Sequence, residues 1–277
     1  MTRFINNTKT AMLLGLMFGL VLLAGHLIGG TQGLVIAFML GGLGNLFAYF
    51  YSDKIAIASM RGQQVDQRSA PDLIEMVSRL SRNAGLPMPR VYVCPQEAPN
   101  AFATGRNPKN AAVAVTQGAL KLLSYDELEG VIGHELAHVK NRDTLTSTIA
   151  ATIAGAISAL GWVFMFGGRS RDVNPLVALL FVFLAPIAAG IIQLAISRSR
   201  EFVADADGAA IVGSPHGLIS ALQKLEAVAK RVPMQNQMPT QNHMFIVQPL
   251  SGGGGFAGLF STHPSTAQRI AKLRELA

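Results

Sequence analysis

Charged residues are missing from three long stretches of the chain, at residues 10–52, 144–168 and 173–197. A helix that spans a bilayer needs about 20 consecutive, mostly apolar residues. The first stretch is therefore long enough for two spans, and each of the others is long enough for one. The pattern predicts four transmembrane helices, over about residues 11–29, 34–51, 146–166 and 175–196.

Basic residues flank these apolar runs and indicate the topology. Lys and Arg gather on the cytoplasmic side of membrane proteins. We therefore expect transmembrane hairpins at residues 1–52 and 146–197, and cytoplasmic parts at residues 53–145 and 198–277. The turn between the third and fourth spans carries two Arg and one Asp and would lie outside, which counts against this assignment. Because a second apolar run follows the first, the N-terminal run predicts a retained anchor and not a cleaved signal peptide.

The first cytoplasmic part predicts a helix followed by strands. Residues 70–89 roughly keep a 3.6-residue apolar period, with Pro71 at a first helical position and Gly85 as a stop signal. Ser124 and Glu127 then form a capping box for a second helix. Short apolar runs between turn residues predict three strands, over residues 90–94, 100–105 and 111–115.

The second cytoplasmic part predicts only helices and a loop. The helices are expected over residues 199–210, over residues 215–230 and from about residue 263 to the end. Residues 232–262 are rich in Met, Gln, Pro and Gly and predict a mobile loop. The expected fold is mainly α with a small β-sheet, joined to four transmembrane helices.

Composition narrows the function classes. The chain has 277 residues, of which 50% are hydrophobic and 14% are charged, and its mean hydropathy is +0.35. The net charge is +7, but many of the basic residues flank the apolar runs and do not form a face with aromatic platforms, so nucleic-acid binding is not expected. The single cysteine, Cys94, has no intrachain partner and agrees with a reducing cytoplasm.

The chemistry is expected at His134, Glu135 and His138. Two histidines four residues apart on a helix project from one face, which suits two ligands of a tetrahedral Zn²⁺. Glu135 could take the proton of a water that attacks a carbonyl and pass it to the leaving amine. Such a pattern also arises by chance, but the capped helix and a candidate third ligand argue against that interpretation.

The third ligand should come from another element and leave one position open for water. Glu201 is the best candidate, because it follows the fourth span as His138 precedes the third, and the hairpin would return both to the same side. Asp205, one helical turn later, could accept the second N–H of a ligand histidine, or it could be an ordinary solvated carboxylate. Asp207 leaves the face of Glu201 and is less favoured.

Other residues are candidates for handling the substrate. His263 and Arg269 could donate to the oxyanion of a tetrahedral intermediate, although packing or capping is as plausible for His263. One short segment could be an edge strand that holds an extended substrate, or an ordinary hairpin strand. That segment is Asn100, Ala101, Phe102 and Ala103.

The chain resembles the HtpX-type membrane zinc endopeptidases, relatives of the type I CAAX prenyl proteases. The two pairs of apolar runs lie where that family has them, so the resemblance covers nearly the whole chain. Four segments carry it in the family's order, at residues 100–105, 133–144, 199–205 and 260–270.

The resemblance implies that His134, His138 and Glu201 bind one zinc ion and that Glu135 is catalytic. It also implies a multi-pass protein of the bacterial inner membrane, with its catalytic part facing the cytoplasm, that degrades misfolded or damaged membrane proteins. Its partners would be the bilayer and membrane-protein or unfolded polypeptide substrates. Two alternatives stay open: a narrow processing peptidase of the CAAX prenyl protease type, and a non-catalytic membrane metal-binding protein, which would have no need of Glu135. No oligomeric state follows from the sequence.

Overall fold

The computed structural model describes residues 53–143, 198–231 and 264–276, together with Tyr51 and scattered residues between 8 and 50. Within these described residues, no helix is both long and apolar enough to cross a bilayer. The chain divides into two compact units, one made of residues 1–51 and 146–195 and the other of residues 52–145 and 196–277.

Several predicted segments fall outside the described residues. The third and fourth predicted spans and the predicted loop at residues 232–262 lie wholly outside them, and the first two spans lie mostly outside. The second unit is the one that the structure describes in detail, and it contains every predicted site residue, of which only His263 lies outside the described residues.

A four-stranded mixed sheet in the order β1-β2-β4-β3 lies within the second unit. Strand β2 is parallel to β4, whereas β1 pairs with β2 and β3 pairs with β4 in the antiparallel sense. Strand β3 therefore forms one edge of this sheet. The three predicted strands are confirmed to within a residue at each end, but the short, exposed β1 was not predicted. The bounds are β1 (Gln63–Gln64), β2 (Arg90–Cys94), β3 (Ala101–Thr104) and β4 (Ala112–Thr116).

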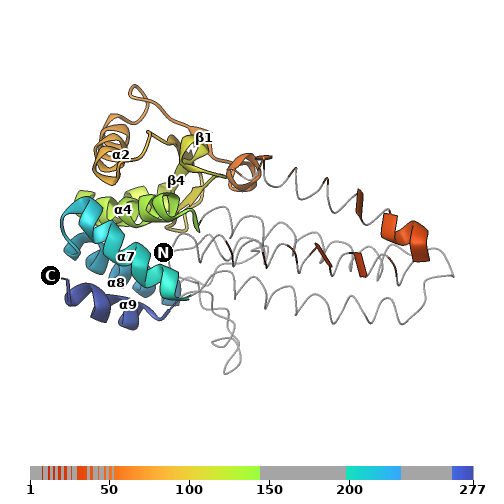
Figure 1. Ribbon diagram of the computed structural model, residues 1–277. Coiled ribbons are helices and arrows are strands. Elements are labelled where there is room, and N and C mark those ends of the chain that lie inside the picture. The colour runs from red at the N-terminus through yellow and green to blue at the C-terminus, as the bar shows by residue number, and fades with distance from the viewer. Residues whose placement is uncertain are drawn as a thin grey trace. The chain divides into compact units, whose positions relative to one another are not determined.

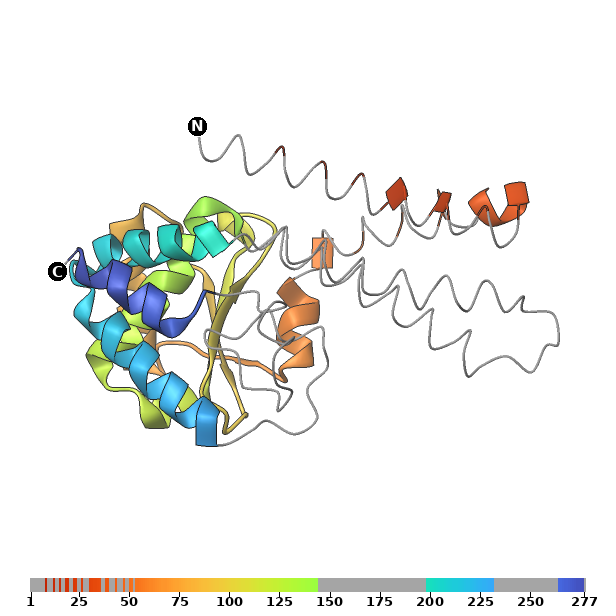
Figure 2. The same cartoon turned by 90° about the horizontal axis from the view of Figure 1, so that it is seen from below.

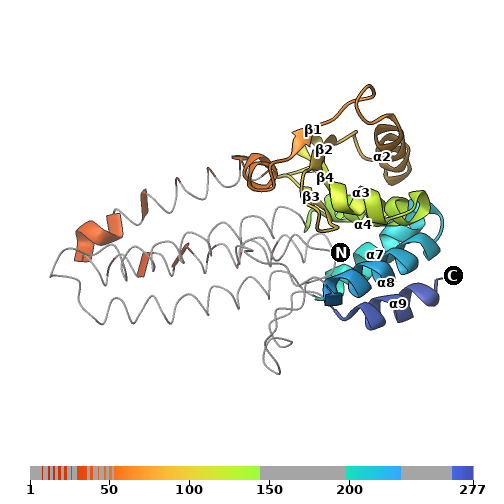
Figure 3. The same ribbon diagram turned by 180° about the vertical axis from the view of Figure 1, so that it is seen from behind.

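Helices cover the sheet in layers. Figure 1 shows α4 between the sheet and a layer formed by α7, α8 and α9, and Figure 2 shows this outer layer from below. The short α3 joins β4 to α4 (Figure 3) and was not predicted, because it is too brief to show a period. The bounds are α2 (Pro71–Ala84), η1 (Pro108–Asn110), α3 (Gln117–Leu122), α4 (Tyr125–Asn141), α7 (Arg198–Val212), α8 (His216–Arg231) and α9 (Thr266–Arg274).

Local sequence signals explain where α2 and α9 begin and end. Pro71 lies in the first turn of α2, and Gly85 ends that helix with φ 67°, a left-handed conformation that glycine adopts without steric strain. Ser265 and Gln268 form a capping box at the start of α9. The predicted helices over residues 70–89 and at the C-terminus are thus confirmed, with the first ending at Ala84.

The alternation of side chains along the strands divides the core in two. On one face, Val91, Val113 and Val115 pack in the same cluster as Val131, Leu136 and other apolar residues of α4. On the other face, Cys94, Phe102, Ala112 and Ala114 pack with Ala56, Ile57 and Met60, which belong to or directly follow the helical residues 53–59. Helix α4 is therefore fixed to the sheet by its apolar side chains.

Candidate metal centre and active site

The N-terminal end of α4 is anchored through Glu127. Its carboxylate accepts hydrogen bonds from the Ser124 backbone N–H at 2.8 Å, from the Ser220 hydroxyl at 2.5 Å and from Lys224 Nζ at 2.7 Å. Burial alone would raise the pKa of Glu127, but the contacts with Lys224, Ser220 and Ser124 lower it to about 2. Because Ser220 and Lys224 belong to α8, this network fixes the start of the helix against α8.

Two glycines allow α4 and α7 to approach closely. A Cβ atom added at Gly208 would lie 2.8 Å from the His134 backbone nitrogen, and one added at Gly133 would lie 3.1 Å from the Gly208 carbonyl oxygen. No side chain fits between backbones at these separations. The close crossing brings the first turn of α7, with Glu201, over the histidines of α4.

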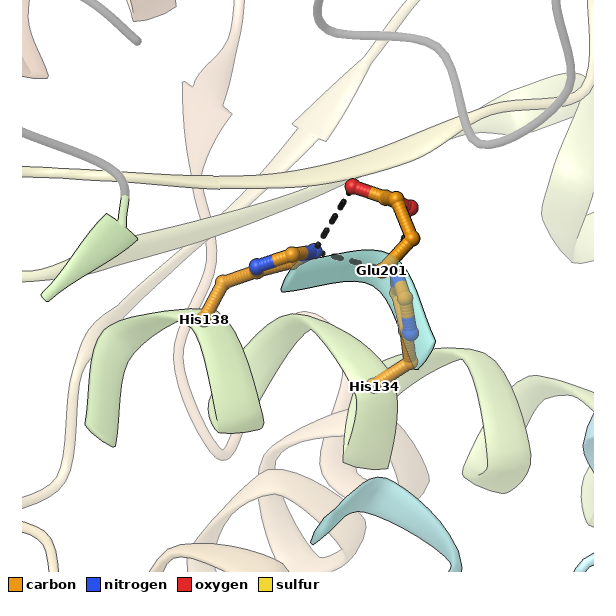
Figure 4. A group of neighbouring side chains, drawn as sticks. All are labelled: His134, His138 and Glu201. Atoms are coloured by element: carbon orange, nitrogen blue, oxygen red, sulfur yellow. Dashed lines mark hydrogen bonds and ion pairs between the residues drawn. The ribbon is translucent and has the colours of Figure 1, made fainter. Parts of the chain in front are cut away.

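His134, His138 and Glu201 form a compact group of side chains that could hold a metal ion. One ligand atom from each lies within 4.8 Å of the others, and Figure 4 shows the three side chains pointing toward one another from α4 and α7. The two Nε2 atoms are 3.1 Å apart, and each is 3.7 Å from a carboxylate oxygen of Glu201. Two imidazole nitrogens and one carboxylate oxygen form the donor set of many catalytic zinc sites. The residues therefore fit a divalent metal ion.

Asp205 and Arg269 lie behind His134. Asp205 Oδ1 is 2.9 Å from His134 Nδ1, and Arg269 contacts both oxygens of that carboxylate, at 2.6 and 2.9 Å. Burial would raise the pKa of Asp205, but the charge and hydrogen bonds of Arg269, with that from His134, lower it to about 2. A carboxylate that accepts from Nδ1 leaves Nε2 available to a metal, which is the geometry expected of Asp205.

His138 has a similar neighbour, which sequence reasoning did not single out. Asp143 Oδ2 is 3.3 Å from His138 Nδ1, and Asp143 Oδ1 is 3.3 Å from Arg200 Nη1. Burial opposes a charged imidazole, but the hydrogen bond to Asp143 and the charges of Glu201 and Glu135 outweigh it and raise the pKa of His138 to about 9.

Glu135 points toward the edge of the sheet. Its Oε2 accepts a hydrogen bond of 2.8 Å from the Ala103 backbone N–H on β3. Within the described residues, β4 is the one strand that pairs with β3, and this N–H lies on the side of β3 that no described strand covers. The Glu135 carboxylate is thus held next to β3, the strand that the sequence analysis considered as a binding edge for an extended substrate.

Four further candidates from the sequence have different surroundings. His263 lies outside the described residues. Arg269 is 1% exposed and donates to Asp205 through Nε and Nη2, an arrangement that favours support of His134 over donation to an oxyanion. Asp207 accepts from Asn141 Nδ2 at 2.7 Å and is outside the histidine group. Asn100 is buried, and its carbonyl oxygen accepts from the Thr116 N–H.

The fold and this site define a metallopeptidase: an anchored helix with two histidines and a glutamate, a second helix with a third metal-binding side chain, and an edge strand beside them. The chain belongs to peptidase family M48, whose family model matches residues 67–277. The predicted resemblance to HtpX-type proteases is confirmed by relatives along almost the full length.

These relatives are named "Protease HtpX homolog". The chain is 53% identical to the one from Persephonella marina, covering 97% of this chain and 96% of the relative. It is 51% identical to the one from Paraburkholderia phytofirmans (98% and 97%) and 48% identical to the one from Thermococcus sibiricus (97% and 95%).

A solved structure shares the fold. The crystal structure of S. mikatae Ste24p aligns with a TM-score of 0.55 at 18% identity. The alignment covers 98% of this chain but 66% of that longer one. At this identity the likeness concerns the fold alone.

Proposed function

We propose that this metallopeptidase binds one zinc ion through His134, His138 and Glu201 and hydrolyses peptide bonds of misfolded or damaged membrane proteins. The observation that carries the proposal is the convergence of these three side chains beside Glu135 and the edge strand β3. The four apolar runs of the sequence support a membrane location, and their basic flanks support a catalytic unit on the cytoplasmic side of a bacterial inner membrane.

Zinc is the metal that these side chains suit best. Catalytic zinc sites use three protein ligands from His, Asp or Glu and keep one position open. When bound, zinc supplies Lewis acidity and lowers the pKa of water toward neutrality. Asp205 orients His134 for this task, with Arg269 holding the Asp205 carboxylate in place.

Glu135 acts as the general base and then as the general acid. Its carboxylate accepts the proton of the attacking water and delivers it to the leaving amine. The Ala103 N–H holds the carboxylate at the sheet edge, where the scissile bond of an extended substrate would lie. Residues 100–103 hold the substrate as an added strand, since β3 has an open edge beside Glu135. The chain supplies a base, a metal site and a substrate edge in one place.

The test is proteolysis by the purified full-length protein in detergent or lipid. We expect it to cleave an unfolded membrane protein, to stop after chelation and to recover when zinc returns. Glu135→Gln should retain zinc and lose roughly 10²- to 10⁴-fold in rate, the usual contribution of a general base. Glu129→Gln is the matched control, because Glu129 is a buried carboxylate of the same helix that pairs with Arg79 away from the site.

Three outcomes would contradict parts of the proposal. Cleavage by Glu135→Gln at the wild-type rate would contradict the assigned mechanism. Zinc-loaded wild-type protein that cleaves no polypeptide would favour the non-catalytic alternative. A preference for one short processed peptide over unfolded membrane proteins would replace quality control with a narrow processing role.

A further inference from the structure

Both metal-binding histidines are supported by an aspartate and an arginine, but the two supports come from different parts of the chain. His134 contacts Asp205, which pairs with Arg269. His138 contacts Asp143 at 3.3 Å, and Asp143 pairs with Arg200 at 3.3 Å. In the second support, Asp143 and Arg200 are 5% and 7% exposed, so the ion pair is shielded from water.

The backbone returns Asp143 toward His138. Helix α4 ends at Asn141, and its C-cap, Arg142, has φ 61°. A residue with a Cβ atom adopts this left-handed conformation only where its surroundings hold it. The turn places the next side chain, Asp143, against a histidine of the helix that has just ended. Arg142 thus both ends α4 and directs the Asp143 carboxylate toward His138.

Arg200 connects this support to the third metal-binding residue. It precedes Glu201 in the first turn of α7, so one helical turn provides both a metal-binding carboxylate and the partner of Asp143. Asp143 also lies immediately before residues 144–197, and Arg200 lies three residues after their end. The pair therefore joins two parts of the second unit that are far apart in the sequence, beside His138.

We propose that Asp143 and Arg200 are positioning residues of the metal site. Asp143 accepts from Nδ1 of His138, which keeps Nε2 available to the metal and sets the plane of the ring. Arg200 holds the Asp143 carboxylate and keeps the start of α7, with Glu201, at the correct distance from α4. This inference rests on the proposed zinc site.

The test measures zinc affinity of the full-length protein by competition with a chromophoric chelator. Asp143→Ala and Arg200→Ala should each weaken zinc binding by about 10- to 100-fold, the range for residues that orient metal ligands. Both should also alter the visible spectrum of the cobalt-substituted protein, since that spectrum reports the geometry around the metal. Arg200→Lys, which keeps the charge, should restore part of the affinity.

Three further variants sharpen the test. The double variant Asp143→Ala/Arg200→Ala should bind zinc no more weakly than Asp143→Ala alone, because Arg200 acts through Asp143. Arg79→Ala removes the ion pair between Arg79 of α2 and Glu129 of α4, which lies away from the histidines. This variant should leave the zinc affinity and the cobalt spectrum unchanged. Asp143→Asn preserves the side-chain shape and replaces Asp143→Ala if that variant does not fold.

The outcomes separate this inference from the proposed function. If Asp143→Ala binds zinc as tightly as the wild type and has an unchanged cobalt spectrum, the positioning role is overturned and the proposed zinc peptidase is unaffected. The same holds for Asp143→Asn where that variant is used instead. A wild-type protein that binds no zinc would overturn the proposed function and this inference with it. Equal losses in Arg79→Ala would show a general effect of ion-pair removal and would also overturn the role.

Discussion

Helix α4 buries Glu127 in its first turn and Glu135 in its C-terminal half, and the surroundings of these two carboxylates differ. Glu127, near the N-terminus, is 5% exposed and accepts from a backbone N–H, a hydroxyl and an ammonium group. Glu135, two turns later, is 6% exposed and accepts from the Ala103 N–H at an open sheet edge, beside two histidines. Both are buried to the same degree, so burial alone does not distinguish them.

The difference shows how one helix combines support and chemistry. At the first end, donors surround the carboxylate and its low pKa keeps it charged, which favours a purely structural role. At the other end, the carboxylate faces metal-binding side chains and an edge that a substrate can join. The contacts of Glu127 fix the position of α4, and that position determines where His134, Glu135 and His138 lie.

The largest difference is expected between Glu201→Ala and Glu127→Ala, in the amount of zinc that each variant binds. Glu201→Ala deletes one of three metal-binding side chains and should weaken zinc binding by more than about 100-fold, the upper range for outer supporting residues. Metal analysis after dialysis should find the variant free of zinc and inactive. Glu127→Ala should keep a full complement of zinc, although it unfolds more easily. Full zinc retention by Glu201→Ala would move the third ligand to another residue.

The features predicted from the sequence are those with short-range signals. Ser124 and Glu127 are three residues apart and cap α4, and His134 and His138 share a helix face, so local patterns were sufficient for both. Strand β1 has two exposed polar residues, Gln63 and Gln64, and no apolar pattern to predict it.

Contacts between segments that are distant in the sequence could be identified only from the folded structure. Asp143 and Arg200 are far apart in the sequence, and neither position lies in a sequence pattern that would identify the other as its partner. Arg269 was predicted near the chemistry, but only the crossing of α7 and α9 shows that it holds Asp205. Glu201 was predicted because it follows the fourth apolar run as His138 precedes the third, and Asp205 because it lies one helical turn after Glu201. The sequence therefore predicted the metal-binding atoms better than the side chains that orient them.

Glycine substitutions test the comparison through the backbone. A Cβ atom at Gly208 would lie 2.8 Å from the His134 nitrogen, and one at Gly130 would lie 2.4 Å from the Leu218 nitrogen. Gly208→Ala and Gly130→Ala should each destabilise the protein by about 1–3 kcal/mol, as overpacking does. Thermal unfolding of both variants in detergent measures this effect.

Zinc affinity should then distinguish the two glycine variants. Gly208→Ala pushes on the backbone of His134 and should weaken zinc binding in the folded protein, whereas Gly130→Ala pushes on α8 and should not. Equal zinc affinities for the two variants would show that the crossing of α4 and α7 does not set the metal geometry. The matched pair keeps the chemical change constant and varies only its distance from the site.

The effect expected from Glu127→Gln is on stability alone, and it depends on pH. The variant loses charged hydrogen bonds to Ser220 and Lys224, which should lower the free energy of unfolding by about 1–3 kcal/mol at pH 7. The pKa of Glu127 is lowered from 4.5 to about 2 in the folded protein, so the carboxylate stabilises the fold above pH 4.5 and loses that effect as the pH falls toward 2. The stability difference between wild type and variant should therefore narrow below pH 4.5.

Denaturation of both metal-free proteins across this pH range measures the difference in their free energies of unfolding. Groups that titrate alike in both proteins do not contribute to this difference. A difference that stays constant down to pH 2 would contradict the anchoring role of the charge. Unchanged zinc affinity in folded Glu127→Gln would place the function of this helix at its other end.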